Sequence, residues 1–311
     1  MADPLVSVCM ITYNHEPFIA RTIESVLSQK TDFPFEVVIG EDFSTDGTRK
    51  ICKKYQERYP QIIKLLNSDK NLGVNQNLIR TLKSCKGKYI ATLEGDDYWT
   101  DPLKLQKQVD LLETHSKYNL CFTNCSVVDE NNVLVKKSRV PSEIKKKKLK
   151  YYDLLYYTPP TLTVVCRNNR TAINVIEELG IAYDHVLFFL LSRYKDVFFL
   201  SDTTGVHLLN TSSVYHPLTP AEKMEKYSIS NLDILKCLIN NQDKKEVRAL
   251  YYGYAITYAR LFLYASDSFS LSKMLHNFSK LIQSDIITLK PLAPVTLYRL
   301  AKRLMKRIAG N

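Results

Sequence analysis

The feature that most constrains the fold is a regular alternation of strand-like and helix-like segments in the first hundred residues. Short β-rich apolar runs predict strands at 5–12, 35–40, 62–66 and 88–93. The segments between these runs carry apolar residues at helical spacing, as in the predicted helix at 77–85. Strands separated by helices indicate an α/β fold, with a Rossmann-like, mostly parallel sheet and helices on both faces.

The second part of the chain is less regular. Its expected elements are a helix at 103–115, a hairpin from 120–128 and 133–135, a basic loop at 136–150, a strand at 161–166, an apolar helix at 185–192, and short strands at 197–200 and 205–209. From about residue 218 the pattern is helical and amphipathic. We therefore expect an α/β domain over 1–215 and a helical C-terminal region over 216–311.

Polar side chains follow three of the predicted strands. They are Thr12, Tyr13 and Asn14 after the first strand, Asp42 after the second, and Asp96 and Asp97 after the fourth. Ligands of open α/β sheets bind beyond the carboxyl ends of the strands, so these residues are expected to share one rim. The two adjacent aspartates repel each other unless a cation or solvent relieves the charge. A hard divalent ion, held by such carboxylates together with substrate phosphates, fits this rim, and a solvated acidic turn is the alternative.

Two further acids each have two interpretations. Asp42 could accept hydrogen bonds from the base or ribose of a nucleotide, or it could cap the helix that follows. Asp184 precedes the apolar helix at 185–192, so it is either the N-cap of that helix or a general base.

Charge and cysteine content limit the partners and the compartment. The formal net charge is +11, and a basic amphipathic segment at 295–308 is typical of a helix on an anionic membrane surface, although a solvated basic face gives the same pattern. The seven cysteines lack zinc-site spacing and indicate a reducing compartment. No signal-like or membrane-spanning segment is evident, so we expect a cytoplasmic protein that can lie on the inner face of the cell membrane.

Five motifs in a fixed order resemble those of the family 2 glycosyltransferases of the GT-A fold. They lie at 6–14, 41–48, 71–73, 87–90 and 93–99, with a related run at 25–29. The resemblance implies a transferase that moves a sugar from a nucleotide-diphosphate-sugar, expected to be a UDP-sugar, to an acceptor hydroxyl. The acceptor would be a glycan or a lipid-linked glycan in cell-surface polysaccharide or glycolipid synthesis.

The resemblance also implies roles for individual residues. Asp184 would be the catalytic base of an inverting mechanism, and Asp97 and Asp96 would meet Mn²⁺ or Mg²⁺, with Asp96 also near the ribose and diphosphate. The expected nucleotide-sugar-binding residues are Thr12, Tyr13, Asn14, Asp42, Gly73, Asn77 and Asp96.

Two departures from the family pattern stand out. Many relatives carry an Ala-Arg-Asn run where this chain has Asn75-Gln76-Asn77, so a phosphate-binding arginine is expected to be missing. His207 could be either a metal ligand or a core histidine.

Two other functions compete with sugar transfer. A sugar-phosphate nucleotidyltransferase usually needs a glycine-rich basic loop after the first strand, which this chain lacks. A non-enzymatic protein that binds a membrane surface or nucleic acid would suit the positive charge, but the acidic rim argues against nucleic acid.

Overall fold

The computed structural model describes residues 3–145, 148–155, 157–180, 184–193 and 195–210. The expected helical region at 216–311, the basic segment at 295–308 and the boundary near 215 lie outside the described residues. These three expectations therefore stay predictions.

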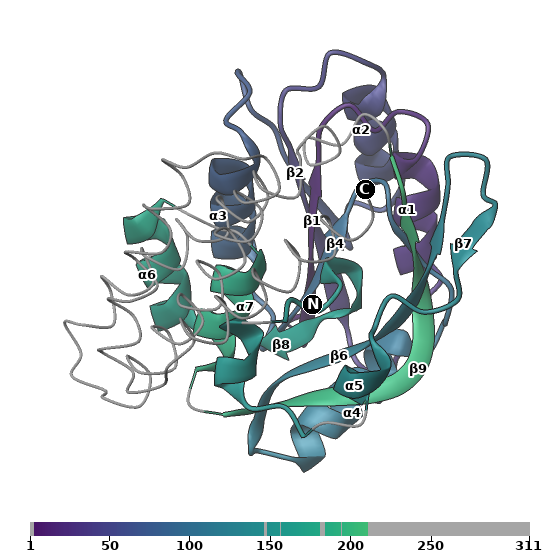
Figure 1. The fold of residues 1–311 in the computed structure, drawn as a ribbon. Helices are drawn as coiled ribbons and strands as arrows, with labels where there is room; N and C mark the ends of the chain where they lie inside the picture. Colours follow the sequence, from purple (N-terminus) through teal and green to yellow (C-terminus); the bar gives the residue numbers. More distant parts are fainter. Residues whose placement is uncertain (1–2, 146–147, 156, 181–183, 194, 211–311) are drawn as a thin grey trace, which may run out of the picture. The chain divides into compact units, whose positions relative to one another are not determined.

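The described strands form a nine-stranded sheet in the order β3-β2-β1-β4-β8-β6-β9-β5, with β7 paired to β6 (Figure 1). The strands are β1 (Val6–Thr12), β2 (Phe35–Glu41), β3 (Ile63–Leu66), β4 (Tyr89–Glu94), β5 (Tyr98–Trp99), β6 (Tyr118–Val128), β7 (Leu134–Lys136), β8 (Val165–Arg167) and β9 (Asp196–Leu208). The first four run parallel, and so do β6 and β9, whereas β5, β7 and β8 are antiparallel to their neighbours. The carboxyl ends of β1, β2 and β4 therefore meet at one edge.

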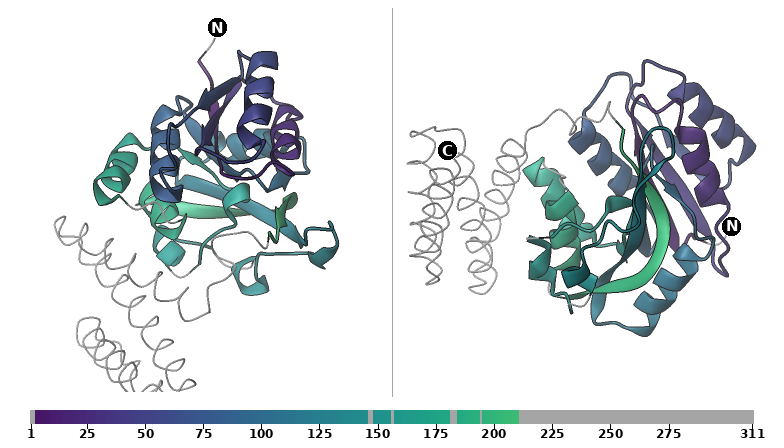
Figure 2. Two further views of the ribbon diagram at one scale, coloured as in Figure 1. Left: turned by 90° about the horizontal axis from the view of Figure 1, so that it is seen from above. Right: turned by 45° about the vertical axis from the view of Figure 1, so that its right-hand side comes forward.

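Helices cover both faces of this sheet, as Figure 2 shows. They are α1 (Ile19–Leu27), α2 (Thr48–Arg58), α3 (Val74–Ser84), α4 (Lys104–Thr114), α5 (Ser142–Lys145), α6 (Arg170–Leu179) and α7 (Asp184–Ser192), with 3-10 turns at Tyr151–Leu155 and Thr161–Thr163. Alternate residues of β1, namely Val6, Val8 and Met10, pack in one buried cluster with side chains of α1, α2 and α4. On the other face α3 packs on β1 and β2, and α6 lies between α3 and α7. The expected α/β architecture is confirmed.

Two expected strand boundaries were wrong. The predicted strand at 161–166 begins as a 3-10 turn, because both the amide and the hydroxyl of Thr163 donate to the carbonyl of Pro160, at 2.9 and 2.7 Å. The predicted strands at 197–200 and 205–209 are one strand, β9. The polar residues in the middle of β9 predict a break between two strands. Instead, the hydroxyl of Thr204 is hydrogen-bonded to that of Thr123 on β6 at 2.6 Å, and the hydroxyl of Thr203 accepts a hydrogen bond from the side chain of Asn124 on β6 at 2.9 Å.

Helix α6 was not predicted, although the sequence carries both of its end signals. The side chain of Asn169 accepts a hydrogen bond from the amide of Ala172 at 3.1 Å, which caps the first turn. Gly180 ends the helix with φ of 64°, the left-handed conformation that glycine adopts without strain.

Lys104, the first residue of α4, has a fully buried side chain. Its ammonium donates to Oε1 of Gln108 at 2.7 Å and lies 4.4 Å from the ring centroid of Trp99. Burial lowers the pKa of Lys104 to about 7. Since this pKa is below that of the unfolded chain, the unfolded state binds more protons between about pH 7 and 10, and the free energy of unfolding should rise with pH.

Lys104→Met is expected to remove this rise, which amounts to at most about 1.4 kcal/mol per pH unit. Urea unfolding at pH 6.5, 8 and 9.5 measures the difference between wild type and variant. The exposed Lys53 provides a control, since Lys53→Met should leave the slope unchanged. Equal slopes for wild type and Lys104→Met would mean that Lys104 is charged in the folded protein throughout this range.

Candidate active site

The loops that follow β1, β2 and β4 are hydrogen-bonded to one another. The amide of Asp42 donates to the carbonyl of Thr12 at 3.1 Å, and the amide of Gly95 donates to the carbonyl of Ile11 at 2.9 Å. These two bonds extend the parallel pairing past the ends of the strands. The structure therefore brings Thr12, Asp42 and Asp96 to one rim of the sheet.

Asp42 is buried and holds the turn at 71–73. Its Oδ1 accepts a hydrogen bond from the amide of Leu72 at 2.8 Å, and the next residue, Gly73, has φ of 79°. Asp42 does not cap the helix that follows, because the N-cap of α2 is Gly47, and the amide of the first helical residue, Thr48, donates to Oδ1 of Asp46 at 3.0 Å. Asp42 thus joins the loop after β2 to the loop after β3.

Asn14 and Asn77 support the rim through hydrogen bonds to the backbone. Oδ1 of Asn14 accepts the amide of Thr45 at 2.8 Å, and Asn14 adopts φ of 54°. The buried Asn77 donates to the carbonyl of Gly40 at 2.9 Å. By contrast, the ring of Tyr13 is exposed, so it is free to face a ligand.

Arg80 is a rim residue that the sequence analysis missed. Its guanidinium donates to the carbonyl of Glu41 at 2.7 Å, to the carbonyl of Asn67 at 2.9 Å and to Oδ1 of Asn77 at 2.9 Å. Burial lowers its pKa, while the charges of Asp42 and Glu41 oppose that effect. An arginine was expected to be absent from this region, but Arg80 reaches the rim from one turn further along α3. The signal that could have found it is its i+3 spacing from Asn77 on one helical face.

Three acids, Glu94, Asp96 and Asp97, lie in close succession at the carboxyl end of β4 and form the acid cluster of the site. Burial raises the pKa of Glu94 well above its ordinary value, and the charges of Asp184, Asp96 and Asp97 raise it further. Burial also raises the pKa of Asp96, and the charge of Asp97 adds to this rise. Like charges gathered in a partly buried site are relieved by a proton or by a bound cation.

Asp97 is almost completely buried and connects the rim to β9. Its Oδ1 accepts the amide of Leu208 at 2.9 Å, and Nδ1 of His207 lies 3.2 Å from the same oxygen. Asp96 is more open, with Nε2 of His15 at 3.8 Å from its Oδ2. The two aspartates therefore differ in accessibility, which the sequence did not reveal.

Asp184 reaches this cluster from the second half of the domain. It is the first residue of α7 rather than the residue before it, and its Oδ2 accepts a hydrogen bond from the hydroxyl of Thr161 at 2.6 Å. The carbonyl of Thr161 in turn accepts from the hydroxyl of Thr92 on β4, also at 2.6 Å. Burial raises the pKa of Asp184, while the hydrogen bond from Thr161 and the charge of Arg139 oppose the rise.

Residues 7–174, more than half of the 311-residue chain, match the family described as glycosyl transferase family 2. This chain belongs to that family. The resemblance recognised from the five motifs is thereby confirmed.

A relative with a glycosyltransferase name agrees with the family assignment. EpsE of Bacillus subtilis, a provisionally named glycosyltransferase, is 41% identical over 132 residues, which cover 42% of this chain and 47% of EpsE. The matched segment thus spans less than half of that relative.

Two solved structures share the fold. TarS 1–349 of Staphylococcus aureus, in complex with UDP, has a TM-score of 0.65 and 23% identity over 96% of this chain and 87% of that one. The mannosyltransferase PcManGT of Pyrobaculum calidifontis, in complex with GDP-Man and Mn²⁺, has a TM-score of 0.54 and 14% identity over 93% and 88% of the two chains. In the described part of this chain, no helix is both long and apolar enough to cross a bilayer.

GT-A glycosyltransferases generally use a divalent metal, and the acidic rim is where this chain could hold one. Among the described residues no three His, Cys, Asp or Glu side chains are arranged to hold an ion. Two ligands that each lie about 2.1 Å from one ion are roughly 3 Å apart, close to the 3.2 Å between His207 and Asp97. A pair of protein ligands completed by substrate phosphates therefore fits this rim.

Two buried polar atoms close to Gly95 have no hydrogen-bond partner. They are Oγ1 of Thr12 and Nδ1 of His15. A Cβ placed on Gly95 would lie 2.5 Å from the first and 2.8 Å from the second, so neither atom leaves room for a side chain at this position. Buried polar atoms are nearly always paired, and unpaired ones at a rim are typical of a site that a ligand completes.

Gly95→Ala is therefore expected to displace Thr12 and His15. We expect it to weaken nucleotide binding and to lower the free energy of unfolding by about 1–3 kcal/mol, since overpacking forces neighbouring atoms to shift. Calorimetric titration and urea unfolding measure the two effects. Thr12→Ala combined with Gly95→Ala should recover part of the stability, because it removes the Oγ1 contact at 2.5 Å and leaves the Cβ of residue 12 at 2.8 Å. Strict additivity of the two changes would contradict the proposed contact.

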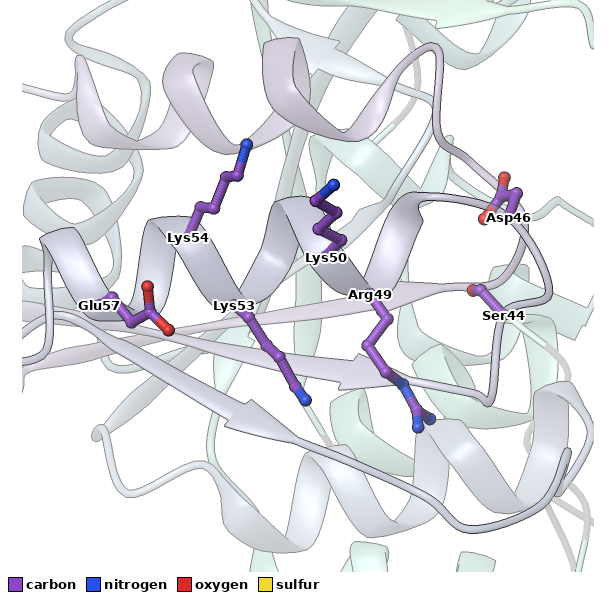
Figure 3. Close-up of a pocket in the computed structure, with 7 residues that line it drawn as sticks. All are labelled: Ser44, Asp46, Arg49, Lys50, Lys53, Lys54 and Glu57. Carbon is purple, nitrogen blue, oxygen red and sulfur yellow. The ribbon is translucent and has the colours of Figure 1, made fainter.

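The structure also contains an open cavity of about 440 Å³ away from these acids, along α2 (Figure 3). It is lined by Ser44, Asp46, Arg49, Lys50, Lys53, Lys54 and Glu57. None of the predicted site residues lines it, and its lysines make it basic where the rim is acidic. We therefore assign the active site to the rim.

Proposed function

We propose that this chain transfers a sugar from a nucleoside-diphosphate sugar, with UDP as the expected nucleotide, to a hydroxyl of a glycan or lipid-linked glycan. The observation that carries the proposal is the position of Asp184. This acid comes from the second half of the domain, yet the Thr161–Thr92 hydrogen bonds hold it beside the acids that end β4. The ligands of TarS and PcManGT, UDP and GDP-Man, support a nucleotide-sugar donor.

Thr12, Tyr13 and Asp42 are the proposed contacts to the nucleoside. The exposed ring of Tyr13 offers a stacking surface for the base, and the unpaired hydroxyl of Thr12 offers a polar contact. Asp42 orients the turn at Gly73 through its bond to Leu72 and keeps acceptor capacity on its second oxygen. Asn14 and Asn77 act through the backbone that they hold in place.

Asp184 is the proposed general base. A base must be deprotonated to accept the proton of the acceptor hydroxyl, and a raised pKa brings it closer to the operating pH. The acceptor oxygen then forms the bond to C1 of the sugar while the bond from C1 to the diphosphate oxygen breaks. The result is inversion at C1, with the proton on Asp184 and the nucleoside diphosphate as the leaving group.

Asp97, His207 and Asp96 are the proposed holders of Mn²⁺ or Mg²⁺. A bound divalent ion would stabilise the negative charge on the departing diphosphate. The protein's own part is to gather these ligands and to hold Asp184 near them through Thr161 and Thr92. The raised pKa values of Glu94 and Asp96 predict that the ion also relieves repulsion among these acids.

A thermal-shift screen tests the proposal. Nucleoside diphosphates and nucleotide sugars are added with and without Mn²⁺ or Mg²⁺, and the midpoint of unfolding is measured. Specific stabilisation by one nucleotide sugar, larger with the ion, is expected, since a ligand at 100 times its Kd adds about 2.7 kcal/mol. Stabilisation by a nucleoside triphosphate with release of pyrophosphate would instead favour a nucleotidyltransferase.

A cytoplasmic location at the inner face of the cell membrane is part of the same proposal. It rests on the expected lipid-linked acceptor and on the basic segment at 295–308, which lies outside the described residues.

A further inference from the structure

The hairpin formed by β6 and β7 carries three consecutive exposed apolar side chains. The exposed fractions are 59% for Val133, 51% for Leu134 and 47% for Val135. Apolar residues are commonly exposed singly, but a contiguous run on a projecting element indicates a contact surface. Figure 1 shows β7 at the outer edge of the domain.

Hydrogen bonds hold the turn of the hairpin in one conformation, so the folded protein exposes the three apolar side chains. Oδ1 of Asp129 accepts the amides of Asn131 and Val133 at 2.9 and 2.8 Å. The guanidinium of Arg21, on α1, donates to Oδ1 of Asn132 at 2.8 Å and fastens the turn to the domain. These bonds hold the three apolar side chains outward before any partner arrives.

Positive charge follows directly after the apolar run. Residues 136–150 contain eight lysines or arginines and one acid. Lys136 and Lys137 are exposed, and so are Lys145 and Lys148 in the following segment. An apolar tip bordered by cations is complementary to an anionic lipid surface. The tip can be buried at the boundary between headgroups and acyl chains, and the cations can bind the anionic headgroups.

We infer that the β6–β7 hairpin docks this protein onto an anionic membrane surface, with Val133, Leu134 and Val135 inserted at a shallow depth and Lys136 and Lys137 among the headgroups. A second copy of the chain fits the hairpin less well. Strand β7 has only three residues and a bulge in its pairing with β6, so it offers little edge for another strand.

The segment that follows the hairpin, residues 138–140, connects it to the domain near the candidate active site. The amide of Val140 and the hydroxyl of Ser138 both donate to Oδ1 of Asn124, at 3.2 and 2.9 Å, and the amide of Arg139 donates to the carbonyl of Cys125 at 2.9 Å. The pKa values of Glu94 and Asp184 are raised by burial, and the charge of Arg139 opposes that rise. A membrane contact at the hairpin therefore lies a few residues along the chain from Arg139, whose charge acts on Glu94 and Asp184. The inference does not require the sugar transfer proposed above.

Sedimentation of the full chain with vesicles tests the inference. Vesicles of phosphatidylcholine alone are compared with vesicles that contain phosphatidylglycerol, at 0.05–0.5 M salt. The full chain is expected to bind the anionic vesicles and to lose binding as the salt concentration rises. Failure to sediment with anionic vesicles at low salt would overturn the inference.

Matched variants then locate the contact. Val133→Ser is expected to weaken binding about fivefold, whereas Val74→Ser, at a 53%-exposed valine on α3, should not. Lys136→Gln with Lys137→Gln should weaken it about tenfold, whereas Lys53→Gln with Lys54→Gln on α2 should not. Since all six side chains are exposed, unfolding midpoints should stay unchanged. Wild-type binding by the hairpin variants, or loss of binding only in the α2 variant, would place the membrane contact elsewhere.

A fluorescence measurement reports insertion directly. The chain has one tryptophan, the buried Trp99, so Leu134→Trp adds a single exposed reporter. Its emission should shift to shorter wavelength on anionic vesicles and be quenched by brominated acyl chains. An unchanged spectrum in protein that has sedimented with the vesicles would exclude insertion of the hairpin. Nucleotide-induced thermal shifts are measured separately, so failure of either proposal is distinguishable.

Discussion

Asp184→Asn is expected to lower turnover by about 10²–10⁴-fold while leaving nucleotide-sugar binding intact. The amide still accepts the hydrogen bond from Thr161 but cannot take a proton from the acceptor. Release of nucleoside diphosphate from the donor identified by thermal shift measures turnover, and calorimetric titration measures donor affinity.

The variant should also be at least as stable as the wild type at neutral pH. Burial raises the pKa of Asp184 in the folded state, so its ionisation costs stability as pH rises through that pKa. Asparagine removes this cost. Asp202→Asn is the matched control, because Asp202 pairs with Lys107 away from the rim. Wild-type turnover in Asp184→Asn would assign the base to another residue.

Thr161→Val tests whether the hydrogen bond from Thr161 tunes the pKa of Asp184 or only holds its side chain in place. The hydrogen bond from Thr161 lowers the pKa of Asp184, so its loss should raise that pKa and move the acid limb of the kcat profile to higher pH. A smaller kcat with an unshifted limb would indicate that Thr161 has only a structural role.

Asp97→Asn and Asp97→Ala are both expected to lose cation-dependent turnover by about 10²-fold or more, but only the alanine variant should be markedly less stable. Asparagine keeps an acceptor for the amide of Leu208, whereas alanine leaves that buried amide unpaired at a cost of about 1–3 kcal/mol. Turnover with increasing Mn²⁺ and urea unfolding measure the two effects.

Asp96→Asn provides the comparison for the cation site. Asp96 is more open than Asp97 and accepts no backbone hydrogen bond from β9, so its substitution should weaken the response to the ion without lowering stability. An Asp97→Asn protein with the wild-type response to Mn²⁺ would show that the ion is held elsewhere.

Much of the fold could be read from local patterns. The alternation around β1 to β4 predicted the parallel half of the sheet, because buried parallel strands read as short apolar runs. The long strand β9 could not be read in the same way. Its polar residues Thr203 and Thr204 are satisfied by Asn124 and Thr123 on β6, which are about 80 residues away in the sequence.

The candidate site likewise contains features that local sequence predicts and features that depend on contacts between distant segments. Residues that directly follow strands, such as Thr12, Asp42 and Asp96, were predictable because parallel strands end at one edge. The backbone contacts that Asp42 and Asp97 make to Leu72 and Leu208 join distant segments and leave no local trace.

The sequence by itself determined the family, the α/β architecture and the rim where the acids gather, since these follow from periodicity and from motifs within single segments. Only the tertiary structure decided that Arg80 reaches the rim, that Asp97 is buried against β9 while Asp96 stays open, and that Thr161 holds Asp184 beside β4. The physical reason is that accessibility and charge coupling depend on distances between segments, and chain order does not encode those distances locally.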